Sequence, residues 1–399
     1  MSFVDTYEKF FFEVFLMGAL LIIIYMAFIS LGLPDSLLGS AWPVMYKNLN
    51  VPMSWSGIIF MIVSFGTIVS SLNSDRLTKC FGSGKVTAVS VALTMIALLG
   101  NSLSHSFIEL CFWAIPYGLG AGSVDAALNN YVALHYRSSH MNWLHCMWGI
   151  GASIGPFIMS WALKKNGNWH LGYRIISMVQ LALTVILFVS LPKWKEKENK
   201  EEEKATHIPL KDVVKIKGVL EIMLAFFCYC SIEQTTGLWA SGWLVKIKGI
   251  DEVRASAFAA LYFTGITIGR ALSGFLAYRF DDRKMIRLGE TVILSGLVCI
   301  LQPWNEDLVL YGLVILGLGS APIFPSLIHS IPSLFGKDRS QSIIGVQMAS
   351  AYAGNITTPP LLGYLARYTG LGLFPYCLLV LTVLLIFLHE RLCAITKEK

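Results

Sequence analysis

A single carboxylate stands in a long apolar stretch of the sequence. Asp125 lies within residues 107–134, whose other side chains suit lipid or a packed membrane interior. An ionised carboxylate is costly inside a membrane, so such residues usually face water, pair with a polar group, or mark the path of an ion or solute. Asn129 follows four residues later and shares its helical face. The pattern predicts a polar site in a membrane helix, although a polar group that only pins two helices together would look the same.

Asp35 is a second carboxylate in such a position. It follows Pro34 and lies near Gly32 and Gly39, and these residue types favour a bend or local opening of a helix. Interrupted membrane helices often supply the binding sites of transporters. The charged form of a carboxylate is disfavoured in a low-dielectric cavity, which lets the group load and release protons. We therefore expect Asp35 and Asp125 to couple transport to protons, although an Asp35 that is only the partner of a nearby donor, or that faces water near the external end of its span, would look the same.

The composition is that of an integral membrane protein. Hydrophobic residues make up 55% of the 399 positions, charged residues only 14%, and the mean hydropathy is +0.62. Apolar runs of about 17–25 residues, each long enough to cross the hydrocarbon layer, recur along the chain. Twelve such runs predict an all-α membrane protein. The eight cysteines show neither metal-ligand spacing nor a disulfide framework.

The distribution of Lys and Arg predicts the orientation. Twelve spans put both termini on one side, and most of the 31 basic residues fall in segments that are cytoplasmic when the N-terminus lies inside. We expect a multi-pass protein of the plasma or inner cell membrane with both termini cytoplasmic. This topology accounts for the net charge of +6, which therefore gives no reason to expect a nucleic acid partner. We expect a monomer in the lipid bilayer.

Residues 193–217 are charged and of low complexity, which predicts a cytoplasmic linker. The linker separates an N-terminal six-helix bundle, residues 1–192, from a C-terminal one, residues 218–399. Two short patterns recur at matching places in the two halves: Ser40, Trp42 and Val44 with Ser241, Trp243 and Val245, and Gly118-Leu119-Gly120 with Gly317-Leu318-Gly319. Repetition of this kind predicts two pseudo-symmetric bundles with a substrate site between them.

A loop motif makes the chain resemble the major facilitator superfamily. Between the second and third spans the sequence reads SSLNSDRLTKCFGSGK, and Asp75 and Arg76 match the central pair of the family motif G-x-x-x-D-R-x-G-R. Ser71 stands where the first Gly belongs, and Lys79 is the nearest base. The eighth span and its loop, GRALSGFLAYRFDDRK, carry Arg270 and a similar cluster of charges. The resemblance implies that Asp75, Arg76 and Arg270 act in the conformational switch.

Four runs are similar to the fucose/glucose/galactose proton symporter family: LPDSLLGS, SVDAALNNY, NWLHCMWGIGASIGP and GRALSGFLAYRF. Sugar symporters of that family carry acids in the first and fourth spans, where Asp35 and Asp125 stand, Asp125 at a place where Glu is common. His145 and Trp148 stand where those symporters tend to carry amides. The resemblance implies proton-coupled symport of a monosaccharide or similar small polar solute by alternating access.

The polar and aromatic side chains of the spans suit a sugar-like substrate. Sugar hydroxyls need neutral hydrogen-bonding groups, and sugar C–H faces need flat apolar rings. We expect the substrate to contact a set of such side chains: Asn129, His145, Trp148, Glu233, Gln234, Trp239, Gln347 and Asn355. Glu233 and Arg270 are also placed to pair across adjacent helices, which would give them a structural role.

Two other classes of function compete with symport. A proton antiporter that expels an amphipathic compound would use the same fold and acids, and the polarity of the substrate separates the two; the Asn and Gln residues favour a polar solute. A membrane enzyme needs paired catalytic groups or metal ligands. H-E-x-x-H does not occur, and the G-x-S-x-G string at residues 151–155 lies inside an apolar run and not in the strand-to-helix context of a catalytic nucleophile. We expect neither enzyme activity nor a metal or cofactor.

Overall fold

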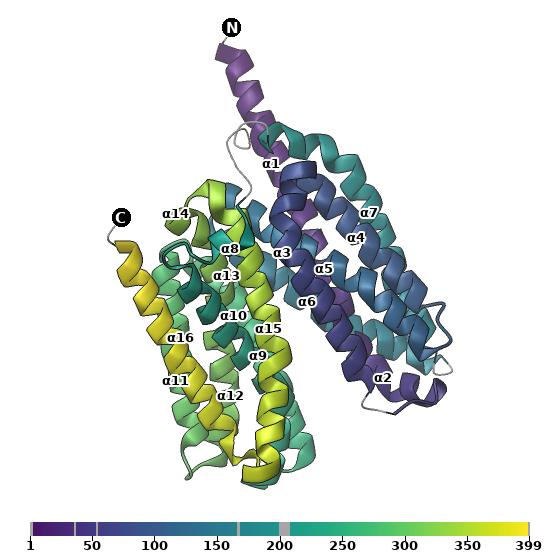
Figure 1. The fold of residues 1–399 in the computed structure, drawn as a ribbon, viewed down its shortest axis with the longest axis vertical. Helices are drawn as coiled ribbons and strands as arrows, with labels where there is room; N and C mark the ends of the chain where they lie inside the picture. The colour runs from purple at the N-terminus through teal and green to yellow at the C-terminus, as the bar shows by residue number, and fades with distance from the viewer. Residues whose placement is uncertain (1–2, 36, 53–54, 166–167, 199–207, 398–399) are drawn as a thin grey trace. The chain divides into compact units, whose positions relative to one another are not determined.

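The computed structural model describes residues 3–35, 37–52, 55–165, 168–198 and 208–397 (Figure 1). Within these ranges the regular secondary structure is entirely helical. In chain order the helices are α1 (Phe3–Asp35), α2 (Leu37–Asn48), α3 (Ser56–Phe81), α4 (Ser83–Asn101), α5 (Phe107–His135), α6 (Ser138–Lys164), α7 (Trp169–Glu198), α8 (Leu210–Val213), α9 (Val219–Lys248), α10 (Glu252–Leu276), α11 (Asp282–Leu301), α12 (Glu306–Ser320), α13 (Ile323–His329), α14 (Ile331–Phe335), α15 (Lys337–Thr369), the 3-10 helix η3 (Leu371–Leu373) and α16 (Phe374–Lys397).

Twelve segments of the described chain have the length of a membrane span. The first continues from α1 into α2, and the tenth from α12 into α13. Eight of the twelve are apolar enough to cross a membrane by length and composition alone. The other four, α9, α10, α11 and α15, are long enough but carry more polar and charged side chains. Polar residues in a membrane protein usually face its interior or a wet cavity, so this polarity is consistent with spanning helices.

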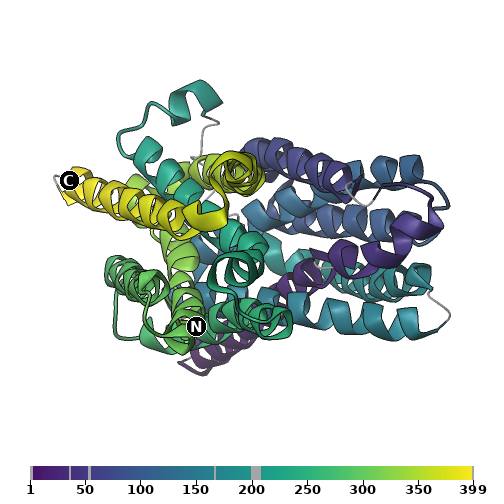
Figure 2. The same cartoon turned by 90° about the horizontal axis from the view of Figure 1, so that it is seen from below.

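The chain forms two compact units. One comprises Met1–Leu128 and Met147–Thr206, and the other Asn129–Cys146 and His207–Lys399, so the division passes through α5 and α6. The long helices of the first unit run side by side in both views (Figures 1 and 2). In the second unit α9 packs against α15 and α16 (Figure 1).

The predicted linker overlaps the end of a helix. α7 continues as far as Glu198, and Trp194 is 1% exposed because its indole fills the space that Gly84 of α4 leaves open. The short helix α8 lies in the later part of the same segment, and residues 199–207 fall outside the described chain. The domain boundaries at residues 192 and 217 stay a prediction.

Glycines let the backbones of the first unit approach closely around α5. A Cβ atom at Gly118 would collide with the Val63 carbonyl oxygen of α3. One at Gly120, two residues on, would lie 2.6 Å from the Ser90 carbonyl oxygen of α4. At Gly122 the closest atoms again belong to α3. Small residues allow such close backbone approach in membrane helices.

The second unit repeats this arrangement around α12. A Cβ atom at Gly317 would collide with the Tyr262 carbonyl oxygen of α10, and one at Gly319 would lie 2.8 Å from the Gly289 carbonyl oxygen of α11. Each of these positions follows its first-half counterpart at one constant spacing: 118 to 317, 120 to 319, 63 to 262, and 90 to 289. The internal repeat seen in the sequence therefore corresponds to a repeated three-helix contact.

Candidate functional site

Asp35 lies where three helices of the first unit meet. Its Oδ2 accepts a hydrogen bond from the indole Nε1 of Trp148 on α6 at 2.8 Å, and its Oδ1 accepts one from the hydroxyl of Tyr117 on α5 at 3.2 Å. Asp35 itself is exposed. Two neutral donors and an open carboxylate form a group that can hydrogen-bond to a polar solute while an aromatic ring lies beside it.

The end of α1 is oriented by apolar packing. Leu33 and Leu37, on either side of Asp35, are buried in a cluster with Met159 of α6 and Trp169 of α7. The carboxylate of Asp35 lies outside this cluster. Asp35 is therefore exposed to solvent although Leu33 and Leu37 are both buried. Burial of such side chains stabilises their position by about 1.5–3 kcal/mol each.

Close backbone contact sets the distance between α1 and α6. A Cβ atom at Gly32 would collide with the Trp148 carbonyl oxygen and would lie 2.8 Å from the Ala152 backbone nitrogen. A Cβ atom at Gly151 would collide in turn with the Ile29 carbonyl oxygen. The two glycines thus bring the Trp148 side chain within hydrogen-bonding distance of Asp35.

Asp125 occupies the middle of α5 and is 8% exposed. The same helix is held against α3 by the glycine contacts, and the Ser71 hydroxyl of α3 donates to the Gly122 carbonyl oxygen at 3.3 Å. The carboxylate expected to carry the proton is therefore a buried side chain on a tightly packed helix. Its role in coupling stays a prediction.

Asn129 and His145, both expected to bind substrate, contact each other. Asn129 Oδ1 and His145 Nε2 lie 3.0 Å apart, and the two residues are 0% and 4% exposed. The His145 ring also packs edge-on against Phe324, with ring centroids 4.6 Å apart. The two residues thus form a buried, hydrogen-bonded polar pair inside the second unit. Contact of either residue with a substrate stays a prediction.

Glu233 and Arg270 form the ion pair that the sequence suggests. Arg270 Nη2 of α10 lies 3.8 Å from Glu233 Oε2 of α9, and the Arg270 side chain is 3% exposed. The Tyr229 hydroxyl donates to the same Glu233 oxygen at 2.6 Å. The expected pairing is confirmed. Arg270 lies within α10 and not in a loop, so a part in the conformational switch would act through this buried pair.

The remaining expected substrate residues of the second unit differ in surroundings. Gln234 is half-buried on α9. Trp239 packs against α15, where its Nε1 donates to the Pro359 carbonyl oxygen at 3.0 Å and its ring lies over Gly363. This geometry satisfies the indole without a ligand and favours a packing role for Trp239.

Gln347 of α15, unlike Trp239, is a buried polar side chain whose hydrogen-bonding groups are not satisfied within the described residues. It is 0% exposed, and within the described residues neither its Nε2 nor its Oε1 has a hydrogen-bond partner; the Asn355 Oδ1 is likewise buried without one. An unpaired buried amide costs about 1–3 kcal/mol, so such a group is expected to bind a polar solute or water. Gln347 is therefore the strongest substrate-binding candidate of the second unit.

The charged motif expected at a turn lies on a helix. α3 runs through it to Phe81, and the turn itself is made at Gly82, whose φ of 79° is a conformation that glycine adopts readily. Asp75 is buried and pairs with Lys79, Oδ1 to Nζ 2.8 Å, whereas Arg76 is exposed. Lys79, one helical turn on, is thus the base that neutralises the buried acid.

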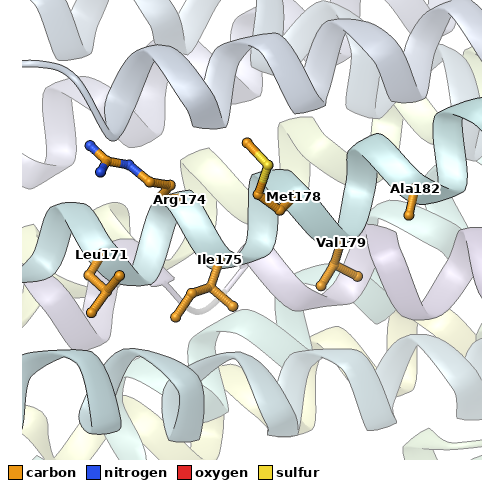
Figure 3. A pocket seen from close by; sticks show the side chains of 6 residues that line it. All are labelled: Leu171, Arg174, Ile175, Met178, Val179 and Ala182. Carbon is orange, nitrogen blue, oxygen red and sulfur yellow. The ribbon is translucent and has the colours of Figure 1, made fainter.

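An open groove lies elsewhere in the first unit. It has a volume of about 570 Å³ and runs along one face of α7, where Figure 3 shows a row of side chains: Leu171, Arg174, Ile175, Met178, Val179 and Ala182. All but Arg174 are apolar. A surface of this kind suits lipid chains better than a sugar, and it contains none of the expected site residues.

The chain matches the family model described as Major Facilitator Superfamily over residues 24–257 and 222–392, which together cover most of its length. The chain belongs to the major facilitator superfamily.

Individual relatives within the superfamily are distant. The Saccharomyces cerevisiae protein named Bypass of stop codon protein 6 is 24% identical, and the match covers 87% of this chain and 77% of that protein. The Bacillus subtilis glucose/mannose transporter GlcP is 22% identical over 85% of this chain and 86% of its own. The crystal structure of the E. coli fucose:proton symporter FucP is similar with a TM-score of 0.78 and 15% identity, covering 93% of this chain and 97% of that one. At this identity the likeness to FucP shows the fold.

Membership of the major facilitator superfamily confirms the all-α fold of twelve membrane helices in two halves. The protein is a multi-pass membrane transporter of small molecules, and superfamily members are not enzymes. Sequence reasoning missed Tyr117 and Tyr229, which hydrogen-bond the carboxylates of Asp35 and Glu233. Tyr117 stands beside Pro116 in the same stretch as Asp125, but only the fold shows which acid it contacts.

Proposed function

We propose that this transporter is a proton-coupled symporter of a monosaccharide or similar small polar solute and works by alternating access. Its place would be the plasma or inner cell membrane, with both termini cytoplasmic, as the positive-inside rule favours. Two similar proteins, a glucose/mannose transporter and a fucose:proton symporter, support this choice of substrate class.

The observation that carries the proposal is the exposed carboxylate of Asp35 between Trp148 and Tyr117. A carboxylate accepts hydrogen bonds from sugar hydroxyls, and an indole or phenol ring offers an apolar face to the C–H groups of the sugar. An amphipathic drug-like compound has few hydroxyls to satisfy such a group. The Gln347 amide, which has no hydrogen-bond partner among the described residues, supports the same class of solute from the second unit.

Asp125 is the proposed proton carrier, and Asp35 links protonation to the solute. Asp125 is buried among the helices of the first unit, where the low dielectric constant makes the electrostatic effect of binding or releasing a proton largest. Glu233 is a weaker candidate because Arg270 and Tyr229 already hold its carboxylate. The proton would thus bind in the first unit.

The test is uptake into proteoliposomes that contain the purified protein. Labelled glucose, galactose, mannose and fucose are offered with and without an imposed pH gradient, acid outside, and the solute that accumulates is then followed in variants. Asp125→Asn keeps the shape and much of the hydrogen bonding of a protonated acid but cannot release a proton. It should lose concentrative uptake and retain part of the counterflow, because exchange never requires the empty, deprotonated carrier to return.

Two comparisons make the test specific. Glu109→Gln removes an exposed acid from the same helix, one that accepts a hydrogen bond from the His105 backbone, and should leave concentrative uptake unchanged. Asp35→Asn should reduce counterflow as well as uptake. If no sugar accumulates, and an amphipathic cation such as ethidium moves across the membrane in the direction opposite to the protons, the protein is an antiporter. If Asp125→Asn still concentrates sugar, the proton binds elsewhere.

A further inference from the structure

The proline near the end of α1 removes a backbone hydrogen bond at an identifiable place. Pro34 has no N–H, so the carbonyl of Ser30, four residues earlier, lacks the helical donor that residue 34 would otherwise provide. Ser30 is 3% exposed. A backbone carbonyl without a partner inside a membrane protein costs several kcal/mol, so another donor is expected there.

Gln180 of α7 supplies that donor. Its Nε2 donates to the Ser30 carbonyl oxygen at 2.9 Å, and the residue is 1% exposed. Its Oε1 accepts from the hydroxyl of Thr94 on α4 at 3.0 Å. The Thr94 hydroxyl also lies 2.9 Å from the Val91 carbonyl oxygen, so Oε1 shares the hydroxyl proton with that carbonyl. Because Ser30 accepts a hydrogen bond and Thr94 donates one, the NH₂ end of the Gln180 amide faces α1.

The bond from Gln180 holds the last turn of α1, from Ser30 to Asp35. Asp35 follows Pro34 directly, and its carboxylate must lie at 2.8 Å from the Trp148 indole to make the observed hydrogen bond. On its α6 side this turn is fixed by the contact of Gly32 with the α6 backbone. On its α7 side the turn is held by the hydrogen bond from Gln180.

We infer that Gln180 is a positioning residue, which satisfies the backbone carbonyl left open by Pro34 and thereby places the Asp35 carboxylate against Trp148 and Tyr117. The use of Asp35 in transport rests on the proposed function, but the bond and its effect on Asp35 do not. They are therefore tested first without any substrate.

The bond is tested by a double-variant comparison of thermal stability. Gln180→Leu keeps most of the side-chain volume but leaves the Ser30 carbonyl without a donor, and should lower Tm by about 3 °C. In a Pro34→Ala background the new N–H at residue 34 can bond to Ser30, so Gln180→Leu should then lower Tm by about 1 °C or less. Equal losses in both backgrounds would overturn the inference, because they would mean that Gln180 acts through other contacts.

A second measurement does not depend on the folding of Pro34→Ala. The rate at which dicyclohexylcarbodiimide modifies Asp35 is followed by mass spectrometry of the purified protein, with Asp35→Asn as the blank. Gln180→Leu should change this rate about threefold or more because the carboxylate moves relative to its neighbours. Thr184→Val removes another buried hydroxyl of α7, whose hydrogen bond stays within α7, and should leave the rate unchanged. An unchanged rate in Gln180→Leu would show that Asp35 is placed without it.

Transport kinetics then relate the position of Asp35 to the proposed function. With the sugar identified by uptake, Gln180→Leu should raise KM about tenfold while Vmax per folded carrier changes little. An unchanged KM with a loss confined to the amount of folded carrier would show that Gln180 supports only folding. If no sugar is transported at all, the proposed function fails while the stability and labelling results still decide the role of Gln180.

Discussion

A methyl group added at residue 32 should move Asp35 away from its hydrogen-bond partner Trp148. In Gly32→Ala the added carbon would lie 2.8 Å from the Ala152 nitrogen and closer still to the Trp148 carbonyl oxygen, whereas ordinary contact begins at 3.4 Å. Both atoms belong to the α6 backbone, so no side-chain rotation relieves the overlap. The helices must separate by about 1 Å at this point, and overpacking of this kind costs about 1–3 kcal/mol.

The separation should break the contact between Trp148 and Asp35. The Nε1 to Oδ2 distance of 2.8 Å would rise beyond the hydrogen-bond limit. We expect Gly32→Ala to lower Tm by about 1–4 °C and to reduce proton-driven sugar uptake per folded carrier by about tenfold. Both are measured on purified protein, the first by thermal unfolding in detergent and the second in proteoliposomes.

A matched control lies on the same helix. At Gly18 no described atom lies within 4 Å of the added carbon, so Gly18→Ala should leave both Tm and uptake close to those of the unmodified protein. A Gly32→Ala protein with unchanged stability and uptake would refute the reasoning, because α1 and α6 could not then approach as closely as described.

Three further substitutions test other parts of the molecule. Glu233→Gln leaves the buried Arg270 without its carboxylate and should cost about 3–5 kcal/mol of stability, seen as a lower Tm; a Glu233→Gln, Arg270→Met protein should regain part of the loss. Gln347→Leu should raise the KM for the transported sugar about tenfold at unchanged protein yield. Equal loss of binding and yield would instead assign Gln347 a structural role. Asp75→Asn removes the partner of Lys79 and should slow counterflow severalfold at constant KM; an unchanged rate would remove Asp75 from the switch.

The fold could be predicted from the sequence because the membrane sets simple local requirements. A span needs sufficient length and apolar character; twelve described segments have the length, and eight of them also have the apolar composition. The pairing of Glu233 with Arg270 was likewise predictable, since opposite charges in neighbouring spans are strongly driven to meet. The residue at which α3 ends was harder to predict. A charged motif near the end of a span is compatible either with a loop or with the last turn of the helix.

The surroundings of Asp35 could be predicted only in part. Pro34 and Gly32 mark an irregular helix end in the sequence itself. Tyr117 and Trp148 lie 82 and 113 positions away in the chain, and no local pattern connects them with Asp35. Their contact with it follows from how α5 and α6 pack, which depends on many backbone contacts together.

The glycines at 118, 120, 317 and 319 bear on how the two halves could have diverged. Their contacts are made largely by backbone atoms of the neighbouring helices, and backbone atoms are the same whatever side chains surround them. After a duplication of an ancestral half, nearly every other residue of these helices could therefore change without altering the contact. A relationship between the halves would survive as a few glycines at matching positions, long after overall similarity had faded.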